Sequence, residues 1–189
     1  GAVPGWTAVV NDFYVLGSFA TPGTTNPSNA REGSQFATAV RNAPEPDVDS
    51  AALVGGADAS MSMRQDIDVS SFAADIDGGT RTFLLDFDWF DNDAADQGVV
   101  TISFLDGSGN KIGHPSVFTT VDSPAGWTKT RQPAYPLAGT RTIRITVAAD
   151  KNGTGNSTVR NIHFDDFVGR LVHFDSDNDL LPDPWEIGY

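Results

Sequence analysis

Acidic side chains near the C-terminus recur at a spacing that suits cation binding. Counted from position 1, carboxylates stand at positions 1, 3, 5, 9 and 12 of one short segment, as Asp175, Asp177, Asp179, Asp183 and Glu186. Position 7 is Leu181. In an EF-hand loop the seventh residue offers its backbone carbonyl, and the final Glu binds Ca²⁺ through both oxygens. The spacing therefore predicts a calcium site, and the alternative is an acidic, disordered tail.

Two details of this segment modify the prediction. The position where an EF-hand loop turns sharply, and where glycine is normally required, is occupied by Leu180. A leucine with positive φ costs about 1 kcal/mol or more, so either the turn differs or calcium affinity is reduced. Asp183, Pro184 and Glu186 also suit the N-cap and first turn of a helix. The chain ends three residues after Glu186, so we expect it to be cut out of a longer protein.

Residues 175–186 resemble the acidic calcium repeat, of the thrombospondin type 3 kind, found in bacterial surface and secreted proteins. The resemblance is partial because of Leu180. It implies that this segment joins neighbouring domains and takes no part in catalysis. Calcium is accordingly the cofactor we expect.

Composition restricts the possible classes of protein. The chain has 189 residues, 12 of them Phe, and no Cys, so its stability comes from packing and metal binding rather than from disulfides. We expect one domain over residues 1–171 and the acidic repeat over 172–189. The net charge of −13 argues against nucleic acid and anionic membrane surfaces as partners. No apolar run approaches the roughly 18 residues of a membrane span. A secreted or cell-surface bacterial protein fits these features.

Apolar and polar residues alternate along several segments before residue 172, as is typical of strands. In residues 82–90 one face carries Phe83, Leu85, Phe87 and Trp89, and the other carries Leu84, Asp86, Asp88 and Phe90. Residues 99–105 and 140–148 alternate similarly, with inward sets Val100, Ile102, Phe104, Ile143, Ile145 and Val147. Further strands are predicted over residues 9–16, 35–40, 60–69, 116–121 and 160–171. Any helix is short. The pattern predicts an all-β, antiparallel β-sandwich of about eight or nine strands.

The order of several short motifs resembles the galactose-binding-like jelly rolls, which include many bacterial carbohydrate-binding modules. The motifs are Asp12-Phe13, residues 31–37, residues 63–69, the strand at 82–90, Trp127 and residues 162–168. The resemblance implies a jelly roll with a structural calcium between the N-terminal segment and the closing strand. It implies Asp165 as a ligand, with Asp12 and Glu32 supplying further oxygens. The alternative is a pair of acidic residues at a strand bulge.

The outward strand faces suggest a place for a sugar. Sugar recognition needs aromatic planes for the apolar ring face and planar polar groups for the hydroxyls. If their strands are neighbours, one polar surface with an aromatic edge is formed by Asp86, Asp88, Phe90, Thr101, Ser103, Arg144, Thr146, Asn161 and His163. Trp127 is either a platform for a sugar or a plug at the end of the sandwich. The alternative is an ordinary solvated sheet face.

Known catalytic motifs are absent from the sequence. It has no Gly-x-Ser-x-Gly, no His-Glu-x-x-His and no phosphate-binding glycine loop. Asp86 and Asp88 lie near each other on one strand face, whereas a glycosidase pair usually sits on separate elements across a cleft. His163 either faces a ligand groove or is an ordinary surface histidine on a strand. The sequence thus predicts a non-catalytic, calcium-stabilised carbohydrate-binding module of a larger secreted bacterial protein, with a polysaccharide and neighbouring domains as partners. A structural or adhesive module is the first alternative, and a polysaccharide lyase or hydrolase is the second.

Overall fold

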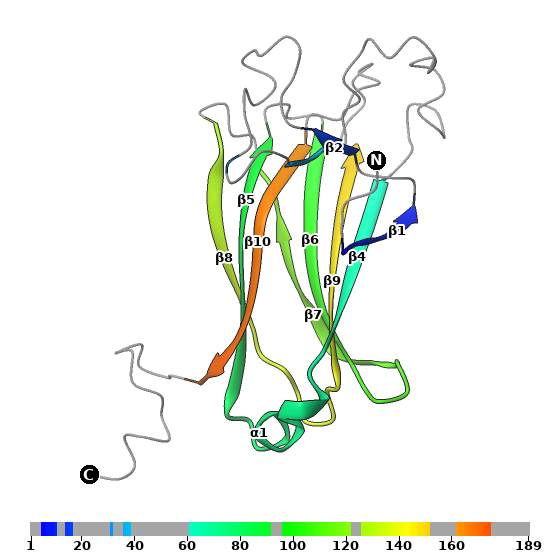
Figure 1. The fold of residues 1–189 in the computed structure, drawn as a ribbon, viewed down its shortest axis with the longest axis vertical. Coiled ribbons are helices and arrows are strands. Elements are labelled where there is room, and N and C mark those ends of the chain that lie inside the picture. Colours follow the sequence, from blue (N-terminus) through cyan, green and yellow to red (C-terminus); the bar gives the residue numbers. More distant parts are fainter. Residues whose placement is uncertain are drawn as a thin grey trace, which may run out of the picture.

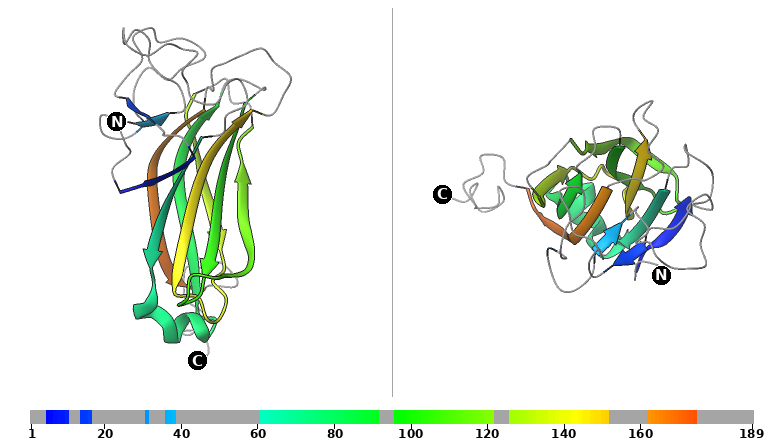
Figure 2. Two further views of the ribbon diagram at one scale, coloured as in Figure 1. Left: turned by 90° about the vertical axis from the view of Figure 1, so that its right-hand side faces the viewer. Right: turned by 90° about the horizontal axis from the view of Figure 1, so that it is seen from above.

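The computed structural model describes residues 5–10, 14–16, 31, 36–38, 61–91, 96–121, 126–151 and 162–174. These residues form two five-stranded antiparallel sheets that pack face to face, as Figures 1 and 2 show. The predicted antiparallel β-sandwich of jelly-roll type is confirmed. No helix among the described residues is long and apolar enough to cross a membrane.

Sheet A contains the strands on one side of the sandwich. Its order is β1 (Thr7–Val10), β4 (Met61–Asp68), β9 (Thr142–Lys151), β6 (Asp96–Leu105) and β7 (Lys111–Thr119). Every neighbouring pair is antiparallel. β6 and β9 pair over their whole lengths, from Asp96–Lys151 to Leu105–Thr142, so they form the rigid centre of this sheet.

Sheet B forms the other side. Its order is β2 (Tyr14–Leu16), β3 (Phe36–Thr38), β10 (Ile162–His173), β5 (Arg81–Asp91) and β8 (Thr128–Ala134). A 3₁₀ turn at Ser70–Phe72 and the short helix α1 (Ala73–Asp77) lead from β4 in sheet A to β5 in sheet B. Figure 1 shows α1 at one end of the sandwich.

The core consists of the inward faces of both sheets. The inward sets predicted for β5, β6 and β9 are buried, with Leu85, Phe87, Val100, Ile102, Ile143 and Val147 fully enclosed. Each such side chain contributes roughly 1.5–3 kcal/mol by leaving water. Trp6 also packs on this core, with its ring centroid 5.1 Å from that of Phe167.

A β-bulge divides β10 into two parts. Asp165 pairs with Asp88 and Val168 with Asp86, so two residues of β10 stand opposite a single residue of β5. Asp166 takes a positive φ of 50° there, a conformation that Asp tolerates better than most residues. The extra residue lets Phe167 point inward, where it stacks on Phe87 with centroids 5.5 Å apart.

Most predicted strands are present, and one strand was missed. β8, with the sequence TKTRQPA, shows no alternation of apolar residues. Its inward residues are Thr128, Thr130, Gln132 and Ala134, because these pair with the inward residues of β5. Two of the inward polar groups have partners: the indole N–H of Trp89 donates to Thr130 Oγ1 (2.9 Å), and Gln132 Nε2 donates to Ser116 Oγ (3.0 Å). The Gln132 Oε1 atom is buried and accepts no hydrogen bond from the described residues.

Gly98 in β6 fits where no other residue would. A Cβ at this position would lie 2.8 Å from Phe164 Cζ, 2.8 Å from Thr120 Cγ2 and 3.0 Å from Ile162 Cγ2. The Gly98 N–H donates to Thr120 Oγ1 (2.8 Å), and that hydroxyl donates to the buried carboxylate of Asp91 (2.5 Å). Thr120 is therefore held in place, and Phe164 and Ile162 are fully buried, so a side chain at position 98 would overpack this part of the core.

We predict that Gly98→Ala lowers the free energy of unfolding by about 1–3 kcal/mol through overpacking. Gly107→Ala is the matched control, because its Cβ would meet nothing closer than Arg141 Cγ at 3.8 Å. Urea denaturation of both variants measures the difference. Equal stabilities of the two variants would contradict the packing described for Gly98.

Candidate functional site

The strand register of sheet B places polar and charged residues in rows across its outer face, the face turned away from the core. β8, β5 and β10 lie side by side there. One row is Lys129, Asp88 and Asp165; the next is Arg131, Asp86 and Val168; and the third is Pro133, Leu84 and Arg170. We call these three rows, with the aromatic residues at either end, the sheet-B face.

Asp86 lies at the centre of the sheet-B face and holds two arginines. Arg131 donates from Nε to Oδ1 (2.6 Å) and from Nη2 to Oδ2 (3.1 Å), and Arg170 Nη1 donates to the same Oδ2 (2.5 Å). The Asp86 side chain is only 4% exposed, whereas those of Arg131 and Arg170 are 61% and 48% exposed. The hydrogen bond from Arg131 is the main cause that lowers the pKa of Asp86. Asp86 is thus a buried anion beneath two solvated cations.

The neighbouring row is acidic. Asp88 is 1% exposed, and burial raises the pKa of its carboxyl. Its Oδ1 accepts no hydrogen bond from the described residues, although Arg31 Nε lies 3.6 Å away. Opposite Asp88, the carboxylate of Asp165 accepts the backbone N–H of Arg31 (2.7 Å) and that of Asp166 (2.9 Å).

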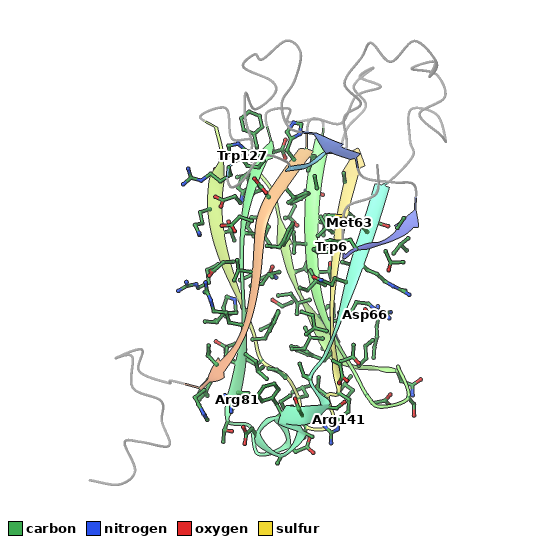
Figure 3. The ribbon with its side chains drawn as sticks, in the orientation of Figure 1. Trp6, Met63, Asp66, Arg81, Trp127 and Arg141 are labelled. Carbon is green, nitrogen blue, oxygen red and sulfur yellow. The ribbon has the colours of Figure 1, made fainter. Side chains whose placement is uncertain are left out.

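Aromatic residues occupy the end of the sheet-B face remote from α1. The ring of Phe90 lies 5.6 Å from that of His163 and 6.1 Å from that of Trp127. Figure 3 shows Trp127 at this end of the sandwich. His163 is completely buried, and burial lowers its pKa to about 3. The imidazole is therefore neutral at physiological pH and does not face solvent.

A second aromatic pair lies at the other end of the sheet-B face. Tyr135 directly follows β8 and is 57% exposed. Its ring meets that of Phe174 edge-on, with centroids 6.0 Å apart. The Phe174 N–H donates to the Thr80 carbonyl (3.0 Å), which fixes Phe174 just beyond the end of β10. These two rings offer an accessible apolar surface.

The predicted binding residues do not form one surface. Asp86, Asp88, Phe90 and His163 share the sheet-B face with Trp127, but Arg144 is on β9 in sheet A. There Arg144 forms two hydrogen bonds with Asp66 (2.7 and 2.8 Å). The prediction of a single surface that includes Arg144, Thr101, Ser103 and Thr146 is therefore wrong. Asn161 lies outside the described residues.

Burial also corrects the part assigned to three of these residues. Asp88, Phe90 and His163 are on the outer side of sheet B, yet none is exposed. They support the face rather than touch a ligand. The residues that the sequence reasoning missed are Arg131, Arg170, Tyr135 and Phe174. One signal was available: a carboxylate at position 86 inside an apolar strand needs a cation beside it, and the chain has only 12 lysines and arginines.

The predicted calcium ligands are described only at Asp165. Asp12, Glu32, Asp175, Asp177, Asp179, Leu181, Asp183 and Glu186 lie outside the described residues. Within the described part, no group of three or more acidic or histidine side chains is arranged to hold a metal. Asp165 and Asp166 lie at the bulge of β10. This position agrees with the alternative to a calcium site, a pair of acidic residues at a strand bulge.

Comparison with known proteins shows similarity in fold only. No protein-family model matches the chain, and no curated protein matches it significantly. The enzymatically active domain of tailspike protein 4 from bacteriophage CBA120 has a TM-score of 0.57 and 17% identity over 89% of this chain. The matched region is 20% of the tailspike chain. The likeness shows a shared β-sandwich fold, and this chain spans about a fifth of that protein's length.

Two smaller modules are less similar. The C-terminal family 22 carbohydrate-binding module of Clostridium thermocellum Xyn10B gives a TM-score of 0.48 and 16% identity over 90% of this chain and 87% of its own. The CBM22-1 xylan-binding domain of Paenibacillus barcinonensis Xyn10C has a TM-score of 0.45 and 13% identity, over 93% of this chain and 90% of its own. At such TM-scores neither likeness supports an inference about this chain.

Neutralising Asp86 and neutralising Asp88 should change the free energy of unfolding in opposite directions. We predict that Asp86→Asn lowers the free energy of unfolding at pH 7 by about 1–3 kcal/mol, because it leaves two arginines without their carboxylate. Asp88→Asn should raise it, because the raised pKa of Asp88 means that its charged form is disfavoured in the folded state. Urea denaturation between pH 3 and pH 7 measures both effects.

The pH dependence has a definite sign in each case. The lowered pKa of Asp86 gives stability that is full above its unfolded pKa of about 3.9 and is lost as the pH falls through the folded pKa. The penalty from Asp88 is full above its raised pKa and disappears as the pH falls through that value toward about 3.9. A destabilised Asp88→Asn variant at pH 7 would contradict this account.

Proposed function

We propose that the chain is a non-catalytic carbohydrate-binding module of a secreted, multidomain bacterial protein, and that the sheet-B face holds the glycan. The observation that carries the proposal is the combination on this face of one exposed aromatic ring (Tyr135), two partly exposed ones (Phe174 and Trp127), and two exposed guanidinium groups held by Asp86. Tyr135 and Phe174 lie at one end, Trp127 lies at the other, and Arg131 and Arg170 lie between them.

Such an arrangement suits sugars for a physical reason. A pyranose ring has an apolar face of C–H groups, which packs on an aromatic plane, and a rim of hydroxyls, which accept hydrogen bonds from planar donors. The apolar side chains of Leu84, Pro133 and Val168 lie between the charged groups. They offer a surface on which the C–H groups of a sugar ring can pack. A strand face is rigid, so the groups need little ordering when a ligand binds.

The same geometry speaks against catalysis at the carboxylates. A glycosidase needs one carboxyl group that can give a proton and a second that acts on the opposite side of the bond. Asp86 is fixed as an anion between two arginines, and Asp88 is buried beneath the face. His163 is neutral and enclosed. Binding without turnover is therefore the function that the described residues favour.

We predict that Tyr135→Ala weakens polysaccharide binding about five- to tenfold, since one aromatic contact is worth about 1 kcal/mol. Isothermal titration with a panel of soluble xylans, glucans and mannans in the presence of calcium measures the affinity. Val117→Ala is the control, because Val117 is equally exposed (56%) on β7 of the other sheet. Absence of binding by the unaltered chain across the panel would favour the structural or adhesive alternative.

Calcium is part of the proposal through the C-terminal repeat and Asp165. A cation that binds only the native state adds stability by linkage, so EDTA should lower the melting temperature, and added Ca²⁺ should restore it. Asp177→Asn combined with Asp179→Asn should weaken calcium binding in a titration. An unchanged melting temperature in EDTA would refute a calcium ion that stabilises the sandwich, while calcium titration would still test the repeat itself.

A further inference from the structure

The two arginines of the sheet-B face carry more charge than their partner neutralises. Arg131 and Arg170 share the single carboxylate of Asp86, and both bond to its Oδ2. The three groups together have a net charge of +1. Lys129, the next cation on β8, lies 3.6 Å from Asp166, so its charge is already balanced. The excess positive charge is therefore confined to the two guanidinium groups.

Both guanidinium groups keep donors available. Asp86 accepts one pair of N–H groups from Arg131 and a single N–H from Arg170. Among the described residues no other side chain or carbonyl accepts from either arginine. Because about half or more of each side chain is exposed, the remaining N–H groups point toward solvent, where a ligand can reach them.

The buried carboxylate also fixes where these donors stand. A free arginine side chain loses rotamer entropy when it binds a ligand. Here Asp86, itself held in the central strand of the face, has already ordered both side chains. Their planar forks match a carboxylate group, which accepts two parallel N–H bonds from one guanidinium. This part of the face is thus preorganised for an anion on the ligand.

The surroundings limit how much negative charge the ligand can have. Asp88 and Asp165 lie in the adjacent row with Lys129, Asp166 follows at the bulge, and the whole chain has a net charge of −13. A polymer with a charge on every sugar would meet repulsion along most of its length. A mostly neutral polymer with separated carboxylates would place one of them on the arginines and its neutral sugars elsewhere.

We infer that the sheet-B face recognises a polysaccharide with a mainly neutral backbone and isolated uronic acid groups, whose carboxylate binds Arg131 and Arg170. This inference rests on the proposed function and specifies its ligand. The comparison within the molecule is Arg144, which forms two hydrogen bonds with Asp66 on the other sheet. Arg64 also acts on the Asp66 carboxylate through its charge, but the Arg144 side chain is only 25% exposed, so this group presents less guanidinium surface to an anion than Arg131 and Arg170 do.

The test compares one polymer in two forms. The probes are a glucuronoxylan and the same glucuronoxylan after chemical reduction of its carboxyl groups to alcohols. The unaltered chain should bind the native polymer at least about tenfold more tightly than the reduced one. The difference should shrink with added salt, because the contact is ionic and exposed. Polygalacturonate, which carries a charge on every sugar, should bind more weakly than glucuronoxylan.

Variants assign the effect to the two arginines. Arg131→Gln and Arg170→Gln should each lower affinity for the native polymer by a much larger factor than affinity for the reduced polymer, because only the native polymer loses charge-assisted bonds to its carboxylate. Arg144→Gln should change neither affinity. Melting temperatures of all three variants verify that they are folded. Equal loss for both polymer forms would show a merely structural role and overturn the inference.

The other outcomes separate this inference from the proposed function. Equal binding of both polymer forms, or binding only to neutral polysaccharides of the panel, would keep the carbohydrate-binding function and overturn the uronate inference. Tighter binding to polygalacturonate would overturn the requirement for isolated charges. Failure to bind any polysaccharide would refute the proposed function and the inference together.

Discussion

Strand β5 is buried on both of its faces, and this constraint determines how the rest of sheet B is built. Its inward residues Phe83, Leu85, Phe87 and Trp89 form the core with sheet A. Its outward residues Asp86, Asp88 and Phe90 are also buried. A carboxylate in such a place is costly unless cations accompany it. The positions of Arg131 on β8 and Arg170 on β10 follow from that requirement, and with them the chemistry of the outer face.

Alternation in the sequence was enough to predict the inward half of the molecule. Val100, Ile102 and Phe104, and likewise Ile143, Ile145 and Val147, face the core as expected, because period-two patterns report which side of a strand is apolar. The alternation of apolar and polar residues does not reveal whether the outer face of a strand is covered by other parts of the chain. Asp88, Phe90 and His163 were therefore placed on the correct face but wrongly taken to be exposed.

The remaining features depend on contacts between distant residues. Strand β8 was missed because its inward threonines and glutamine have polar partners in place of apolar ones, such as Trp89 and Ser116. Arg170 donates a hydrogen bond to Asp86, which is 84 residues away in the sequence. No local sequence pattern predicts that pairing. Arg144 was grouped with the wrong strands because the order of strands in a sandwich cannot be deduced from alternation alone. The calcium repeat stays a prediction.

The bulge at Asp166 has a consequence for how this fold can change in evolution. Side chains on a strand alternate between faces, so one added or removed residue reverses every later position until the end of the strand. If the same residues formed a regular strand without the bulge, Val168, Arg170 and Val172 would turn into the core, and Gly169 and Leu171 would turn outward. A one-residue deletion at the bulge would keep these faces, because Val168 would still lie opposite Asp86. A deletion elsewhere in β10 would reverse them, so length changes outside the bulge should be selected against far more strongly than a deletion at the bulge.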